Sequence, residues 1–162
     1  MDRIIVGYNG SEQAERALKR AADLARALGA RLLVVSVARS PRLADTVPAV
    51  EPDVPVVALP GPVATGAPTP LPVPHEPRPE PEEIAQRQLE RARLSLARMR
   101  VEAEYVAEVG DAAERLLTLA QERDANLIVV GSGEHGFLER LLARNVGEAV
   151  AARAGCDVLL VR

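Results

Sequence analysis

The sequence predicts an α/β protein with a five-stranded parallel sheet and helices on both faces. Strand-like and helix-like segments alternate along the 162-residue chain on both sides of a proline-rich stretch. The strand-like segments are short apolar runs, as expected of parallel strands that are buried on both faces. Aromatic residues make up only 2% of the chain, so the core must be built from aliphatic side chains. These observations favour a sheet that is covered by helices rich in alanine and leucine.

The first part of the chain has the pattern of a strand–helix–strand unit. Residues 3–8 (RIIVGY) and 32–37 (LLVVSV) are the expected strands. Between them, Ser11 suits the N-cap and Gly29 the C′ position of a helix with a stripe of alanine and leucine. A strand–helix–strand unit of this length is a βαβ unit, so we expect the two strands to be parallel and the crossover to be right-handed.

The second half repeats the alternation of helices and strands. Acidic and apolar residues alternate in VEAEYVAEV, with Glu102, Glu104 and Glu108 on one side, which predicts an edge strand with a solvent-exposed face. Gly110 and Asp111 then cap a helix. The expected elements are helix 82–100, strand 101–109, helix 112–123, strand 127–130, a helix that ends near residue 150 and strand 157–161.

All 13 prolines lie between Pro41 and Pro81. Proline lacks a backbone donor and fixes φ, so this stretch cannot be an interior helix or a central strand. We therefore expect one domain, residues 1–162, with a proline-rich insertion at about 39–81. Two interpretations stay open. The insertion is either a tolerated surface segment or an arm that packs on a neighbouring subunit or a protein partner.

Composition argues against several classes of function. The net charge of -3 provides no positive field for nucleic acid. No apolar run reaches the length of a membrane span, and no secretory leader is recognisable. Cys156 is the only cysteine, so we expect a small buried apolar side chain and no intrachain disulfide. His135 has no metal-ligand partners at motif spacing. We expect a cytoplasmic protein without a metal site.

The turn Gly131-Ser132-Gly133-Glu134-His135-Gly136 joins an apolar strand to an amphipathic helix. Such a turn can cradle an anion, because free N–H groups and the helix dipole converge there. Ligands of parallel sheets bind beyond the carboxyl ends of the strands, which makes the turns after Tyr8, Val37 and Val130 candidate sites. The literal G-x-G-x-x-G does not indicate a dinucleotide site, since it lies in the last βαβ unit and Asp157 begins the next strand instead of ending it.

Three stretches carry a resemblance to a known family: VGYNGSEQAERAL, VGDAAERLLTLAQERDANLIVVGS and CDVLLVR. Together they resemble the universal stress protein family over residues 3–38 and 101–162. The resemblance implies a Rossmann-like three-layer sandwich with strand order 3-2-1-4-5. It also implies a homodimer that pairs its C-terminal strands across a two-fold axis.

The nucleotide-binding branch of that family carries Gly-x-x-Gly, nine residues, then Gly-Ser or Gly-Thr and Val. An Asp near the end of the first strand and a Val that ends the second strand hold adenine and ribose. Here the Asp position is Asn9, and the second and third glycine positions are Glu134 and Arg144. The candidate nucleotide-binding residues are Gly7, Tyr8, Asn9, Val37, Val130, Gly131, Ser132, Gly133, Glu134, Arg144, Asn145 and Val146.

These departures from the family pattern bear on phosphate binding. Glu134 places a negative charge where a polyphosphate would lie. Arg144 can hold a phosphate in bidentate fashion, or it can neutralise Glu134 in an ion pair that fills the site. Asn9 keeps hydrogen-bonding capacity for a ribose without the charge of a carboxylate.

The sequence therefore leaves two functions open. The first is a small regulatory or stress-response protein that binds ATP, with Mg²⁺, or a related adenine nucleotide weakly. The second is a nucleotide-free homodimeric interaction module with a degenerate phosphate loop. No triad, metal cluster or paired carboxylate indicates an enzyme, so we expect slow ATP hydrolysis at most.

Overall fold

The computed structural model describes residues 2–39, 79–132 and 146–162. All of these residues except Pro79 belong to one compact unit, formed by Met1–Ser40 and Glu80–Arg162. The proline-rich insertion falls almost wholly outside the described residues, so its role stays a prediction. The elements are β1 (Arg3–Gly7), α1 (Glu12–Leu28), β2 (Arg31–Ala38), α2 (Pro81–Met99), β3 (Ala103–Val109), α3 (Ala112–Glu122), β4 (Leu127–Gly131), α5 (Val146–Arg153) and β5 (Asp157–Val161).

The five strands form one sheet in the order β3-β2-β1-β4-β5, and every neighbouring pair is parallel. This confirms the predicted fold class and strand order. In the middle of the sheet, Ile5 of β1 lies opposite both Leu33 of β2 and Ile128 of β4. The strand order reverses between β1 and β4, so this is the topological switch point, beside which ligands of such sheets bind.

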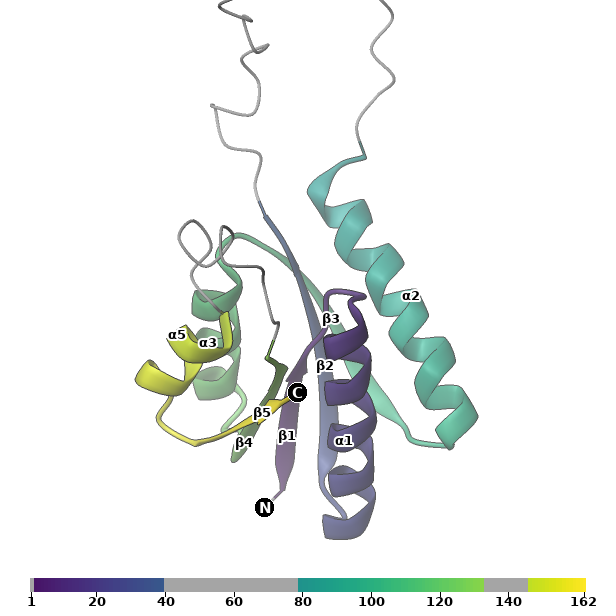
Figure 1. Cartoon of the computed structure of the whole chain (residues 1–162), viewed down its shortest axis with the longest axis vertical. Helices are drawn as coiled ribbons and strands as arrows, with labels where there is room; N and C mark the ends of the chain where they lie inside the picture. The colour runs from purple at the N-terminus through teal and green to yellow at the C-terminus, as the bar shows by residue number, and fades with distance from the viewer. Residues whose placement is uncertain (1, 40–78, 133–145) are drawn as a thin grey trace, which may run out of the picture. The chain divides into compact units, whose positions relative to one another are not determined.

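The sheet has a helical layer on each face (Figure 1). Ile4 and Val6 of β1 pack in a core cluster with alanines and leucines of α1 and α2. Ile5, between them in sequence, packs in a second cluster with side chains of α3 and α5. Because side chains alternate along a strand, each apolar run supplies both cores, which explains why the strands carry few polar residues.

The predicted helix ends are confirmed where a cap marks them. The Ser11 hydroxyl accepts a hydrogen bond from the Ala14 N–H, and Gly29 takes a left-handed conformation with φ of 64°. The Asp111 carboxylate caps α3 in the same way as Ser11 caps α1. Helix α2 begins at Pro81, one residue earlier than predicted, because proline is tolerated in the first turn, where its missing donor has no helical partner.

β3 is an edge strand, as its alternating pattern predicts. Its acidic side chains lie on the surface, where Glu104 pairs with Arg123 at 3.3 Å and Glu108 pairs with Arg115 at 3.8 Å. Both pairs bind β3 to α3 or to the turn that follows it. The described part of the chain contains no helix long and apolar enough to cross a membrane.

Candidate functional site

Three predicted turns meet at the carboxyl edge of the sheet. Val6 of β1 lies opposite Val129 of β4, and Gly7 lies opposite Val35 of β2. The parallel register therefore brings the residues after Gly7 beside the last residues of β2 and β4. Asn9, Val37 and Gly131 are thus brought to one end of the sheet, next to the switch point between β1 and β4. Ligands of open α/β sheets bind in this position, beyond the carboxyl ends of the strands at the switch point.

Four of the candidate residues lie outside the described part of the chain. They are Gly133, Glu134, Arg144 and Asn145. The ion pair between Glu134 and Arg144 therefore stays a prediction.

Gly131, the last residue of β4, is pressed against the first turn of α1. A Cβ atom on Gly131 would lie 2.7 Å from the carbonyl carbon of Gln13 and 2.8 Å from its oxygen. Side chains do not tolerate such distances to a backbone. The close contact of strand and helix therefore requires glycine at this position, whether or not a phosphate is bound.

Ser132 is already engaged within the sheet. Its N–H donates to the Val161 carbonyl at 2.7 Å, and its hydroxyl donates to the same oxygen at 3.1 Å. Both groups extend the pairing of β4 with β5 by one residue. In this structure neither of these two donors is directed at a ligand position.

Asn9 shapes the turn between β1 and α1. Its side-chain oxygen accepts a hydrogen bond from the Ser11 N–H at 3.1 Å, and Gly10 between them has a φ of 75°. Because the oxygen of the amide is used in the turn, its NH₂ group is the part that can face a ligand. Asn9 is exposed.

Tyr8 is buried beside this turn and anchors both helices of its face. Its hydroxyl donates to Glu15 of α1 at 3.0 Å, and the other oxygen of Glu15 accepts a hydrogen bond from Ser95 of α2. Burial, the hydrogen bond to Glu15 and the negative charge of that carboxylate raise the pKa of Tyr8 to about 12. The sequence placed Tyr8 in the site but gave no sign of Ser95, which is 80 positions from Glu15.

A second polar contact ties β2 to α2 at the same edge. Ser36 is fully buried, and its hydroxyl donates to the side-chain oxygen of Gln88 at 2.6 Å. A Cβ on Gly10 would lie 3.7 Å from Cγ of Gln88 and 3.8 Å from Nη1 of Arg91. Sequence reasoning missed Gln88 and Arg91. The available signal was Ser36 itself, the one polar residue in the apolar run 32–37.

The other candidate residues act as packing residues. A Cβ on Gly7 would lie 3.1 Å from Leu116 and 3.2 Å from Val130, so glycine lets α3 approach β1. Val130 belongs to the core cluster under α3 and α5, and Val37 and Val146 pack against that cluster.

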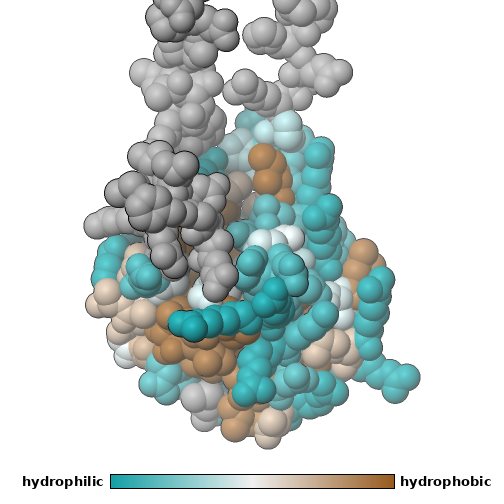
Figure 2. Space-filling model, in the orientation of Figure 1, coloured by the Kyte–Doolittle hydropathy of each residue, from teal (hydrophilic) through white to brown (hydrophobic). Residues whose placement is uncertain are grey.

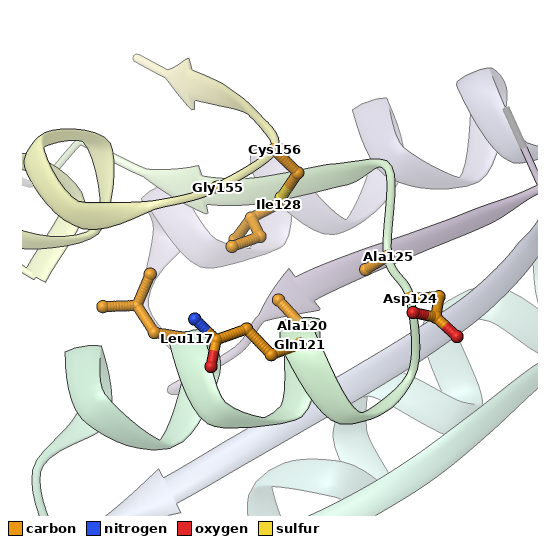
Figure 3. A pocket seen from close by; sticks show the side chains of 8 residues that line it. All are labelled: Leu117, Ala120, Gln121, Asp124, Ala125, Ile128, Gly155 and Cys156. Atoms are coloured by element: carbon orange, nitrogen blue, oxygen red, sulfur yellow. The ribbon is translucent and has the colours of Figure 1, made fainter.

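A pocket of about 300 Å³ opens at the opposite, amino edge of the sheet (Figure 3). Its lining side chains come from α3, the turn that follows it, β4 and the segment before β5. Cys156 lies there and packs against the core cluster under α3 and α5, but it is only partly buried, less than the sequence predicts. Burial, followed by the charge of Asp157, raises the pKa of its thiol. The described residues hold no cluster of potential metal ligands. The lining residues are Leu117, Ala120, Gln121, Asp124, Ala125, Ile128, Gly155 and Cys156.

Comparison with known proteins gives consistent matches. A model of the universal stress protein family matches residues 1–59 and 54–162. The stress response protein NhaX of Bacillus subtilis is 30% identical over 165 residues, which cover 99% of this chain and 98% of NhaX. The universal stress protein YxiE of the same organism is 35% identical over 74 residues, covering 46% of this chain and 50% of YxiE.

Solved structures show the same fold. A universal stress protein in complex with cAMP superposes with a TM-score of 0.64 at 23% identity, covering 99% of this chain and 97% of that one. The universal stress protein from Archaeoglobus fulgidus in complex with dAMP gives a TM-score of 0.63 at 21% identity, covering 100% and 98%. At these identities the likeness establishes the fold alone.

Gly131→Ala is expected to lower the free energy of unfolding by about 1–3 kcal/mol, because the new methyl group overlaps the backbone of Gln13. Urea unfolding measures this change. Gly155→Ala is the matched control, since a Cβ there meets nothing within 4 Å, and it should stay within about 0.5 kcal/mol of wild type. Equal stabilities of the two variants would show that β4 does not press against α1.

The Tyr8 phenol should ionise near pH 12 in a Tyr105→Phe background, where it is the remaining tyrosine. Its folded pKa lies above the unfolded value of about 10, so the stabilisation is complete below pH 10 and is lost as the pH rises from about 10 to about 12. Ultraviolet absorbance titration follows the phenolate. Glu15→Gln should lower this pKa while burial keeps it above 10, and an unchanged pKa would contradict the hydrogen bond.

Proposed function

The chain belongs to the universal stress protein family, and we propose that it is a small stress-response protein that binds an adenine nucleotide weakly at the carboxyl edge of β1, β2 and β4. The convergence of three turns beside the switch point carries the proposal. Two solved universal stress proteins of the same fold are complexes with cAMP and dAMP, which favours adenine nucleotides as the ligand class.

Weak binding follows from what the edge residues already do. Asn9 uses its side-chain oxygen in its own turn, and Ser132 uses both of its donors on Val161. A ligand must compete with these contacts or do without them, and each lost hydrogen bond costs about 0.5–1.5 kcal/mol. For ATP, a Mg²⁺ ion would accompany the phosphates, and the proposal includes slow hydrolysis at most.

The same engaged donors favour a second candidate. In it, the protein binds no nucleotide and acts as a homodimeric interaction module in the cytoplasm. The proline-rich insertion, outside the described residues, would then contribute to the surface that meets a partner.

Titration calorimetry with AMP and with Mg-ATP separates the two candidates. Binding with a dissociation constant between about 10 μM and 1 mM is expected, with GTP as a control for the base. Ligand at about ten times its dissociation constant adds about 1.4 kcal/mol of stability, which raises Tm by about 3–6 °C in a domain of this size. If millimolar nucleotide gives no heat of binding and no shift in Tm, the first candidate is wrong.

The dimer is proposed to form through β5. This strand is an edge of the sheet, so one side of its backbone has no strand partner among the described residues. The surface at β5 is apolar (Figure 2), and Leu160 of this strand is 41% exposed. Two copies of an apolar edge strand can pair across a two-fold axis and cover each other.

Leu160→Lys is therefore expected to shift the protein from dimer to monomer, because it places a charge against its own copy across the axis. Light scattering across a range of protein concentrations gives the mass. Leu94→Lys is the control, since Leu94 lies on α2 and is 63% exposed, and it should leave the mass unchanged. A wild-type protein that is monomeric at every concentration would contradict pairing through β5.

A further inference from the structure

Helix α2 lies beside the turn between β1 and α1. Its first turns extend past the carboxyl end of β1 and the beginning of α1 (Figure 1). Gln88 and Arg91 lie about one helical turn apart on α2, and both come within about 4 Å of the position a Cβ would take on Gly10. α2 therefore brings the side chains of Gln88 and Arg91 beside Gly10, the residue that follows Asn9 in the turn.

The polar groups of Gln88, Arg91 and Asn9 that remain available to a ligand are hydrogen-bond donors. Ser36 donates to the side-chain oxygen of Gln88, which leaves the NH₂ group of Gln88 as the group that can face a ligand. The oxygen of Asn9 is likewise occupied by the Ser11 N–H. Arg91 has donors alone, and no carboxylate of the described residues lies within ion-pair distance of its guanidinium.

The described end of β4 offers a phosphate much less. Both donors of Ser132 are directed at Val161, and Gly131 lies against the backbone of Gln13. A negatively charged group at the edge therefore finds free donors on the side of α2 and not on the described side of β4. The residues of the loop that follows Ser132 lie outside the described part of the chain.

We propose that Arg91, with Gln88 held in place by Ser36, contacts the phosphate of an adenine nucleoside monophosphate and makes this nucleotide the preferred ligand. The inference rests on the proposed nucleotide site and adds the residues that select the phosphate. One guanidinium offers a fork that matches a single phosphate group, and the NH₂ group of Gln88 adds a neutral donor beside it. Ser36, buried beneath Gln88, acts as a positioning residue.

The test compares AMP with adenosine, which lacks the phosphate, by titration calorimetry on the full chain. Wild type should bind AMP at least about tenfold more tightly than adenosine, the size expected for a charge-assisted hydrogen bond. Arg91→Ala should remove this preference by weakening AMP alone, and adenosine affinity should stay unchanged. The preference of wild type should also fall with added salt, and Arg91→Lys should restore part of it.

Arg87→Ala is the matched control, since Arg87 lies one turn earlier on α2 and pairs with Glu83 at 3.5 Å. It should leave both affinities at the wild-type level. If Arg91→Ala weakens AMP and adenosine equally, or weakens neither, the assignment of Arg91 is wrong while the nucleotide site stands. If wild type binds neither ligand at millimolar concentration, the proposed function fails, and the inference fails with it.

Discussion

The carboxyl edge of this sheet depends on the backbone contact between β4 and the first turn of α1. Gly131 approaches Gln13 so closely that no side chain fits between them. The contact places the end of β4 against the helix whose beginning is fixed by the Ser11 cap. Because β1 leads into the same helix, the turns after β1 and β4 are held at one end of the sheet. A glycine that the sequence assigns to a ligand thus has a structural task that precedes any ligand.

Two buried hydroxyl groups position the helices α1 and α2 at the same edge of the sheet. Tyr8 and Ser36 are buried at the carboxyl ends of neighbouring strands, and each donates to a helix of the same layer. Tyr8 reaches Glu15 of α1, and Ser36 reaches Gln88 of α2. A buried hydroxyl without a partner is costly, so these contacts fix how both helices sit on the sheet at the point where a ligand would enter. The raised pKa of Tyr8 reflects this burial and its carboxylate partner.

Most of the fold could be predicted from the sequence, because each element carries a local signal. Local sequence features predict these elements correctly. Examples are the apolar run of β4, the Ser11 and Gly29 caps of α1 and the alternation in β3. The boundaries differ from prediction by one or two residues where no cap marks them, as at the start of β3. The site was less predictable. Contacts such as Ser36 with Gln88 join residues 52 positions apart, and their spacing has no period that a sequence could display.

The prediction that placed the ligand's phosphate at the β4 turn rested on glycine spacing, which reports where a backbone can come close. It does not report which donors are free once the sheet has formed. In the described structure, the N–H and the hydroxyl of Ser132 both donate to the Val161 carbonyl, while the guanidinium of Arg91 lies beside Gly10. A charged ligand is held by free donors and not by close backbone approach alone, so a phosphate is bound most favourably where the donors remain. Among the described residues that place is the side of α2, where we propose that Arg91 contacts the phosphate, while the predicted contribution of Glu134 and Arg144 lies outside the described part of the chain.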